Sequence, residues 1–331
     1  MSNRPIFVVG QARGGTTLVR DVLRAHPQID GSYGESQFFR FYYDQYGDLA
    51  SDTNLDRLLD DLFPTQFFRE LNLDPKAIRT SLHTGDRTYE SVLSMIMSAF
   101  IDQSRAERWV DKSPDHLFAV HTILDMFPEA QIVQVIRDAR DVACSVLKRE
   151  GKHGTSERVD RVASLGLSWE QRILTGWEHQ CTIGRGAYAI VRFEDLIFKT
   201  DRVLEQLSQF LTLKPALTQA MLDRAADSSK SSLASPWTSF DDHGKGILTA
   251  PVGRYKSLLS VEELGLIECL ARECLETCHY ALEGGDIRTA DLLVRMVWHP
   301  TSLQRYIRNR WKHRVLSRRC KSTKPVSVSD E

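Results

Sequence analysis

A short buried strand runs straight into a glycine turn and then a helix at the start of the chain. Residues 5–10 read Pro-Ile-Phe-Val-Val-Gly, an apolar and β-branched run that predicts a strand. Gly14 and Gly15 permit a tight turn and a close approach of the backbone to a ligand. Thr16 and Thr17 then open a helix, whose N-terminus offers amide groups and a positive dipole end. This order predicts an α/β fold with an anion site at the turn.

The turn differs in one position from the phosphate loop of nucleoside triphosphatases. Gly10 and Gly15 match the two fixed glycines of that loop, and Thr17 matches its metal-binding hydroxyl. The lysine position holds Thr16, and a cation stands three residues earlier as Arg13. Because the lysine that reaches the β- and γ-phosphates is missing, the turn favours a different phosphorylated ligand. The alternative is an ordinary glycine turn before a helix.

Composition indicates a globular protein with unevenly distributed charge. The 331 residues, 42% hydrophobic and 26% charged, suffice for one large α/β domain with additions. The formal net charge is −1, but residues 301–331 carry nine Lys/Arg and two acids. No apolar run approaches the ~18 residues that a membrane span needs, and Met1 to Arg4 lead directly into the first strand. We therefore expect a cytoplasmic protein without a signal sequence.

The cysteines and histidines do not have the spacing of metal ligands. The six cysteines are Cys144, Cys181, Cys269, Cys274, Cys278 and Cys320. There is no Cys-x-x-Cys pair, and His116 and His121 are five residues apart, off the spacing of a helical ligand pair. We expect no metal, and free cysteines packed as small core residues in a reducing cytosol.

Strand and helix patterns alternate along the chain. Strands are predicted at residues 5–10, 108–112, 131–136 and 187–191, with a mostly helical insertion at 35–105 and a long Ser/Asp/Gly-rich loop at 227–250. This alternation predicts a P-loop-like, doubly wound, mainly parallel sheet flanked by helices. Ligands of such sheets bind at the carboxyl ends of strands, which here carry residues 11–15, Lys112 and Arg137.

A second basic segment follows the strand at 131–136. Arg137 stands directly after this strand, and Ser145 lies eight residues later on the expected helix. Eight residues span the turn and about two helical turns, so the hydroxyl can face back toward the guanidinium. A permanent cation with a hydroxyl suits a phosphate group. The alternative is a surface ion pair of Arg137 with Asp138 or Asp141.

Both segments resemble motifs of sulfotransferases that use 3′-phosphoadenosine 5′-phosphosulfate (PAPS). The first resembles the family's loop for the 5′-phosphosulfate and comprises Arg13, Gly14, Gly15, Thr16, Thr17 and Leu18. Arg137 and Ser145 match both positions of the family's 3′-phosphate motif. The resemblance implies PAPS as co-substrate and a hydroxyl-bearing acceptor. That acceptor is a sugar, a lipid, a small alcohol or a protein tyrosine.

Residues 5–260 are more closely similar to tyrosylprotein sulfotransferases and their bacterial relatives. Gly34-Glu35-Ser36 resembles the segment that holds their catalytic base, which makes Glu35 the candidate base. Lys112 matches their lysine near the transferring group, and Arg254 matches a late cation. Lys245 is a candidate contact of the 3′-phosphate. Phe193 stands where the family usually has Tyr, so a hydroxyl contact is missing there.

The chemistry of sulfuryl transfer is compatible with these roles. An acceptor hydroxyl attacks better as a carboxylate such as Glu35 removes its proton. The leaving phosphate oxygen gains negative charge, which Lys112 and Arg13 can stabilise. The transferring group carries less charge than a phosphoryl group, so a metal clamp is less necessary than in kinases.

The C-terminal segment is predicted to be a basic amphipathic helix. We divide the chain into a sulfotransferase domain at 1–285 and a helical tail at 286–331. Leu303, Tyr306, Ile307, Trp311 and Val315 are spaced mostly three or four residues apart, with Arg and Lys on the other faces. Such a helix either binds an anionic membrane surface or docks its apolar stripe on the acidic body. No nucleic-acid partner is expected, because no recognition fold accompanies the tail.

Two other functions compete with sulfuryl transfer. One is a kinase-like phosphoryl-transfer enzyme on the same type of sheet, which the missing loop lysine disfavours. The other is a catalytically inactive, nucleotide-binding membrane adaptor. The acceptor pocket is expected in residues 36–105 and 227–250, where no motif identifies the acceptor.

Overall fold

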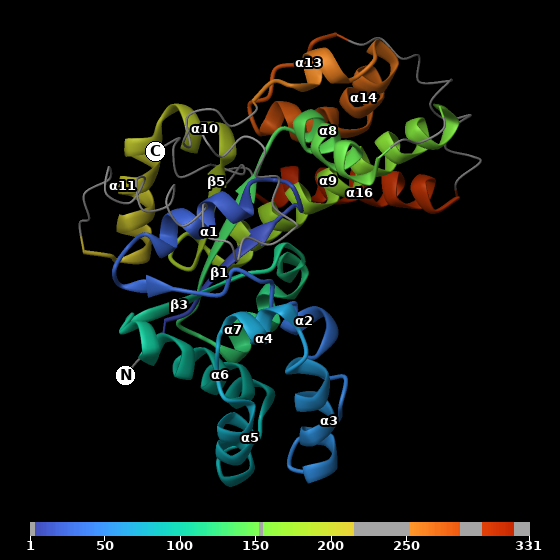
Figure 1. Ribbon diagram of the computed structural model, residues 1–331. Helices are drawn as coiled ribbons and strands as arrows, with labels where there is room; N and C mark the ends of the chain where they lie inside the picture. Colours follow the sequence, from blue (N-terminus) through green and yellow to red (C-terminus); the bar gives the residue numbers. More distant parts are fainter. Residues whose placement is uncertain (1–3, 152–154, 215–251, 285–299, 321–331) are drawn as a thin grey trace. The chain divides into compact units, whose positions relative to one another are not determined.

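The computed structural model describes residues 4–151, 155–214, 252–284 and 300–320. Its five-stranded sheet has the order β2-β3-β1-β4-β5 (Figure 1). The strands are β1 (Ile6–Gly10), β2 (Ile29–Asp30), β3 (Arg108–Lys112), β4 (Gln131–Ile136) and β5 (Tyr188–Arg192). Both β1 and β2 run parallel to β3, with Phe7 opposite Asp111. The α/β prediction and its four strands are confirmed, and only the two-residue β2 was too short to carry a pattern.

Helices flank and connect these strands. They are α1 (Thr16–Arg24), α2 (Phe38–Phe41), α3 (Asp52–Leu62), α4 (Gln66–Glu70), α5 (Pro75–Thr84), α6 (Tyr89–Ser104), the 3-10 helix η1 (Pro114–Ala119), α7 (Val120–Met126), α8 (Ala139–Glu150), α9 (Thr155–Ile183), α10 (Phe193–Phe198), α11 (Thr200–Leu211), α13 (Tyr255–Leu258), α14 (Val261–Thr277) and α16 (Pro300–Arg319). The helical insertion predicted at 35–105 is confirmed as α2 to α6.

The chain divides into two compact units. The first unit comprises residues 1–10, 16–133 and 204–249, and the second comprises 11–15, 134–203 and 250–331. The phosphate-loop residues 11–15 therefore belong to the second unit, whereas the helix that follows them belongs to the first.

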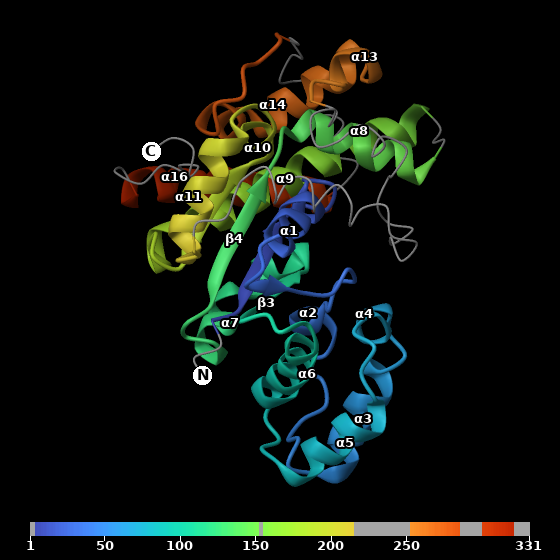
Figure 2. The same ribbon diagram turned by 60° about the vertical axis from the view of Figure 1, so that its left-hand side comes forward.

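The core of the first unit follows the apolar patterns of its sequence. Residues Ile6 to Val9 of β1 have no exposed surface, as expected for a strand buried on both faces of a parallel sheet. In α3 the inward residues recur at helical spacing and are Leu55, Leu58, Leu59 and Leu62. Helix α3 contacts α5, and α5 contacts α6, which packs on β3 (Figures 1 and 2).

The second unit is organised around the long helix α9, which packs against α14 and α16. The indole Nε1 of buried Trp169 donates to the carbonyl of Arg137 at 2.8 Å, which ties α9 to the end of β4. A Cβ on Gly176 would lie 1.8 Å from the Gln134 amide oxygen, so only glycine lets α9 approach β4 this closely. These contacts fix the position from which α8 begins.

Helix α16 lies against the same unit through polar contacts. Arg310 Nη2 is 3.3 Å from a Glu170 carboxylate oxygen, and Lys312 Nζ is 2.6 Å from Glu178. The predicted apolar stripe docks only in part, because Leu303, Tyr306 and Val315 are half-buried whereas Ile307 and Trp311 are 58% and 66% exposed. The buried residues described in α16 are Asn309 and Leu316.

The domain boundary predicted at 285 lies outside the described residues and stays a prediction.

The expectation that all cysteines are free is wrong. A disulfide joins Cys181, in α9, to Cys320, directly after α16, with their Cα atoms 6.3 Å apart. Their separation of 139 residues gives no spacing signal in the sequence. The other four cysteines are not disulfide-bonded. Because disulfides are rare in a reducing cytosol, this pairing removes the cysteine argument for a cytoplasmic location. Within the described ranges, no helix has the length and apolarity needed to cross a membrane.

Candidate active site

The phosphate loop is a tight turn that only glycine can form at two positions. The Gly14 amide donates to the Gln11 carbonyl at 2.9 Å, and a Cβ on Gly14 would lie 2.8 Å from that oxygen. Gly15 has φ 92°, and a Cβ there would lie 2.2 Å from the ring of Phe193. Phe193 therefore packs directly on the loop, a role that needs a ring but no hydroxyl. Arg13 also has positive φ, at 69°, which a non-glycine residue seldom adopts outside functional turns.

The structure brings Arg13, Arg137 and Ser145 together in the second unit, with Arg13 hydrogen-bonded to both other residues. The Arg13 Nε donates to the Ser145 hydroxyl at 3.0 Å, and the Arg137 Nη1 donates to the Arg13 carbonyl at 3.3 Å. The Arg137 guanidinium lies over the Phe193 ring, 4.6 Å from its centroid. We call these three residues the arginine–serine cluster.

The arginine–serine cluster concentrates positive charge. Burial lowers the pKa of Arg13, and the nearby charges of Arg149 and Arg137 lower it further. Arg137 itself is only 6% exposed. Like charges held this close oppose each other unless an anion joins them, so the cluster has the electrostatics of a phosphate site.

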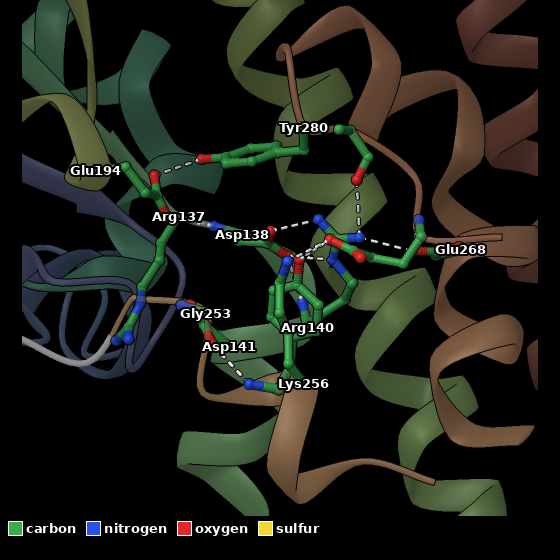
Figure 3. A network of polar contacts seen from close by, with 12 residues as sticks. Arg137, Asp138, Arg140, Asp141, Glu194, Gly253, Lys256, Glu268 and Tyr280 are labelled. Atoms are coloured by element: carbon green, nitrogen blue, oxygen red, sulfur yellow. Dashed lines mark hydrogen bonds and ion pairs between the residues drawn. The ribbon is translucent and has the colours of Figure 1, made fainter. Parts of the chain in front are cut away.

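Asp138, one of the two acids that could neutralise Arg137, is held by other groups. Asp138 caps α8 and accepts from Arg140 Nη2 at 2.6 Å, while Arg140 Nη1 donates to Glu268 at 2.6 Å. Figure 3 shows the Arg137 side chain pointing away from this network. These contacts occupy both oxygens of Asp138 with Arg140.

Asp141 connects α8 to the segment that carries Arg254. Its two carboxylate oxygens accept from the Gly253 amide at 2.7 Å and from the Tyr255 amide at 3.1 Å (Figure 3). Burial raises the pKa of Asp141, and the Gly253 amide, the charge of Arg137 and the Tyr255 amide oppose that rise. Arg254 is thereby held beside the helix that also carries Ser145. Sequence analysis named Arg254 as a candidate cation but did not identify Asp141 as the residue that anchors its segment.

The candidate base and the candidate lysine pair in the first unit. The Lys112 Nζ lies 2.6 Å from the Glu35 Oε1, and the two side chains are 7% and 35% exposed. Burial lowers the pKa of Lys112, and the Glu35 carboxylate opposes this by favouring the charged amine. The two candidate residues therefore lie together, and part of Glu35 remains exposed to solvent.

Three polar side chains of residues 111–116 hold the backbone that follows Glu35. The Ser36 amide donates to Asp111 at 3.3 Å, the Gln37 amide to the Ser113 hydroxyl at 3.1 Å, and the Phe39 amide to His116 Nε2 at 3.2 Å. His116 Nδ1 also lies 2.9 Å from Asp111, at an angle outside hydrogen-bond geometry. Sequence analysis considered His116 only as a metal ligand and missed this role.

The remaining predicted residues lie at the start of α1 or outside the described ranges. Thr16 is buried, and Thr17 and Leu18 are half-buried in the first turn of α1. Their contact with a nucleotide stays a prediction, as do the ligand contacts of Gly14, Gly15 and Arg254. Lys245 lies outside the described residues. No group of three His, Cys, Asp or Glu side chains in the described part of the chain is arranged to hold a metal ion.

Comparison with known proteins identifies the family. The sulfotransferase family profile matches residues 5–216, so the chain belongs to the sulfotransferase family. A putative protein-tyrosine sulfotransferase of Caenorhabditis briggsae is 27% identical over 218 residues, which cover 63% of this chain and 65% of that protein. Protein-tyrosine sulfotransferase A of Caenorhabditis elegans is 22% identical over 217 residues, which cover 63% of this chain and 50% of that protein. The chain thus matches less than two thirds of either relative.

A solved structure shares the fold. The sulfotransferase domain of the Synechococcus PCC 7002 olefin synthase superposes with a TM-score of 0.55 at 18% sequence identity. The superposition covers 82% of this chain and 96% of that domain. The predicted family and the parallel, helix-flanked sheet are confirmed.

Proposed function

We propose that this protein transfers a sulfuryl group from PAPS to a hydroxyl acceptor. The arginine–serine cluster is the observation that carries the proposal, because it gathers two guanidinium groups and a hydroxyl beside a glycine turn. The ribose of PAPS carries a 5′-phosphosulfate and a 3′-phosphate. Arg13 with the loop amides suits the 5′-phosphosulfate, and Arg137 with Ser145 suits the 3′-phosphate.

The proposed reaction is an in-line displacement at sulfur. Glu35 takes the proton of the acceptor hydroxyl while its oxygen forms a bond to sulfur. The bond between sulfur and the 5′-phosphate oxygen breaks, and adenosine 3′,5′-bisphosphate (PAP) leaves with the electron pair. Lys112 and Arg13 stabilise the charge that develops on the leaving oxygen.

Titration calorimetry with PAP and ATP tests the donor site. We expect PAP to bind at micromolar or lower concentration and ATP to bind far more weakly, since the loop has Thr16 where a triphosphate enzyme has lysine. Transfer of radiolabelled sulfate from PAPS to acceptors then tests turnover. Binding of ATP but not PAP would support phosphoryl transfer instead. PAP binding without turnover on any acceptor would support the inactive adaptor.

The acceptor screen separates the hydroxyl classes that the sequence leaves open. Tyrosine-containing acidic peptides are tested first, because the relatives from Caenorhabditis are described as protein-tyrosine sulfotransferases. Sugars, lipid headgroups and small alcohols follow in the same assay. We propose a hydroxyl acceptor for all of these cases, since each offers a proton that Glu35 can remove.

We further propose that α16 contacts an anionic membrane surface. Ile307 and Trp311 lie one turn apart and are exposed, and the exposed Arg308 and Arg314 flank them. Tryptophan favours the membrane interface, and each nearby arginine adds roughly 1 kcal/mol of attraction to anionic lipid.

Vesicle sedimentation checks this contact. The wild-type protein is expected to bind vesicles that contain phosphatidylserine and to release them in high salt, because the attraction is largely electrostatic. Trp311→Ser should weaken binding severalfold. Phe198→Ser is the matched control, since Phe198 is a 71% exposed aromatic residue of α10 in the same unit. Equal effects of the two substitutions, or equal binding to neutral vesicles, would contradict the proposal.

A further inference from the structure

Gln37 adopts a backbone conformation that costs stability. Its φ and ψ are 48° and 23°, the left-handed region that non-glycine residues seldom enter. It precedes α2, yet its side chain makes no capping bond to that helix. Glutamine has no short polar side chain that favours this region, as asparagine does. Local folding therefore gives no reason for glutamine at this position.

The side chain of Gln37 also lowers the stability of the folded protein. Its Nε2 donates to the Glu35 Oε2. Because a carboxylate only accepts, the amide nitrogen must face Glu35 and the amide oxygen must face elsewhere. That oxygen is buried without a hydrogen-bond partner in the described structure. An unsatisfied buried carbonyl is uncommon in native proteins and calls for a functional explanation.

The surrounding residues hold Gln37 in this conformation. The Ser113 hydroxyl accepts its amide at 3.1 Å, and Asp111 and His116 accept the amides of Ser36 and Phe39 on either side. All three acceptors are buried. Strained residues persist when the structure around them is fixed in this way, and they concentrate at active sites.

Both oxygens of Glu35 are consequently held by donors. Lys112 binds Oε1 at 2.6 Å, and Gln37 binds Oε2. A carboxylate held at two points keeps one orientation, whereas Lys112 alone would leave it free to rotate about its contact. A fixed orientation matters for a base that must meet the proton of a bound hydroxyl within hydrogen-bond reach.

We propose that Gln37 is a positioning residue for the carboxylate of Glu35. The inference rests on the proposed function of Glu35 as the base. It explains why this left-handed position holds glutamine rather than glycine: the side-chain amide nitrogen binds Glu35, and the amide oxygen is left unsatisfied as a consequence. Glycine would fit this backbone without strain, but it would release the second carboxylate oxygen.

The decisive variant is Gln37→Gly, measured by turnover, donor affinity and thermal unfolding. We expect kcat to fall about 10- to 100-fold, the range for loss of one hydrogen bond to a charged group. The Kd for PAP should stay within about twofold, because the arginine–serine cluster is untouched. The melting temperature should stay equal or rise, because glycine relieves the left-handed conformation. Gln37→Asn, which also tolerates this backbone but is shorter, should lose turnover similarly.

Arg105→Gly is the matched control. Arg105 is an exposed residue of the same unit with φ 58°, at the C-terminus of α6 and away from Glu35. We expect it to raise the melting temperature without changing kcat.

The outcomes separate this inference from the proposed function. Full turnover of Gln37→Gly would overturn the positioning role and leave sulfuryl transfer intact. A loss of turnover together with a lower melting temperature would also overturn it, since the role would then be structural. Failure of the wild-type protein to bind PAP would instead refute the proposed function.

Discussion

Alanine in place of Arg137 is expected to weaken PAP binding by about 100-fold or more while leaving the fold intact. A fork of two charge-assisted hydrogen bonds to a phosphate contributes about 3 kcal/mol or more, which corresponds to that factor. Arg137 is 6% exposed and lies over the Phe193 ring, so water cannot replace it fully. The substitution also removes its bond to the Arg13 carbonyl, so the loop itself loses support.

Calorimetric titration measures the Kd for PAP, and two further variants serve as comparisons. Arg137→Lys keeps the charge but loses the fork and the stacking on Phe193, so about a tenfold loss is expected. Arg149→Ala removes an exposed arginine of α8 whose charge acts on Arg13. Its effect should be less than about threefold and should vanish at high salt. Equal affinity of wild type and Arg137→Ala would remove the basis of the proposed donor site.

Sequence alone predicted the sheet and the proximity of Arg13 to Arg137, because both depend on local patterns. The strands β1, β3, β4 and β5 are short apolar runs bounded by turn residues, and such runs are readable without an alignment. Arg137 directly follows the carboxyl end of β4, and Arg13 lies close to the carboxyl end of β1. The sheet order places β1 beside β4. Topology therefore brought these two residues together as expected.

The contacts that sequence missed depend on tertiary packing. Ser113 and His116 hold the backbone after Glu35 across more than seventy residues of chain, which no local spacing reveals. Asp141 was interpreted only as an ion-pair alternative for Arg137, whereas it accepts two amides of the segment at 253–255. The disulfide of Cys181 and Cys320 likewise joins two distant helices. In each case the partner is set by packing of elements far apart in sequence.

The second large effect is expected at Glu35. Glu35→Gln keeps the shape of the side chain and an oxygen for Lys112, but it removes the ability to accept a proton. We expect kcat to fall about 100- to 10,000-fold, the usual contribution of general base catalysis. The affinity for PAP should remain within about twofold. Single-turnover measurement with saturating PAPS isolates the chemical step from product release.

Lys112→Met tests the partner of Glu35 and distinguishes catalysis from folding. The Lys112 amine is 7% exposed, and burial lowers its pKa, so the ion pair with Glu35 offsets a desolvation cost rather than adding much stability. Methionine of similar length should therefore leave the melting temperature nearly unchanged. Turnover should nevertheless fall about 100-fold or more, because the charge opposite the leaving oxygen is lost. If Lys112 had no part in the reaction, this variant would keep full activity.

The double variant shows whether the two residues act together. When a base and an electrostatic stabiliser serve the same transition state, removing either one makes the other less useful, so the double loss in kcat is smaller than the product of the single losses. We expect this for Glu35→Gln combined with Lys112→Met. Independent roles would instead give multiplicative losses. A strictly multiplicative result would mean that the 2.6 Å contact between Lys112 and Glu35 is incidental to the reaction, even if both residues contribute to it.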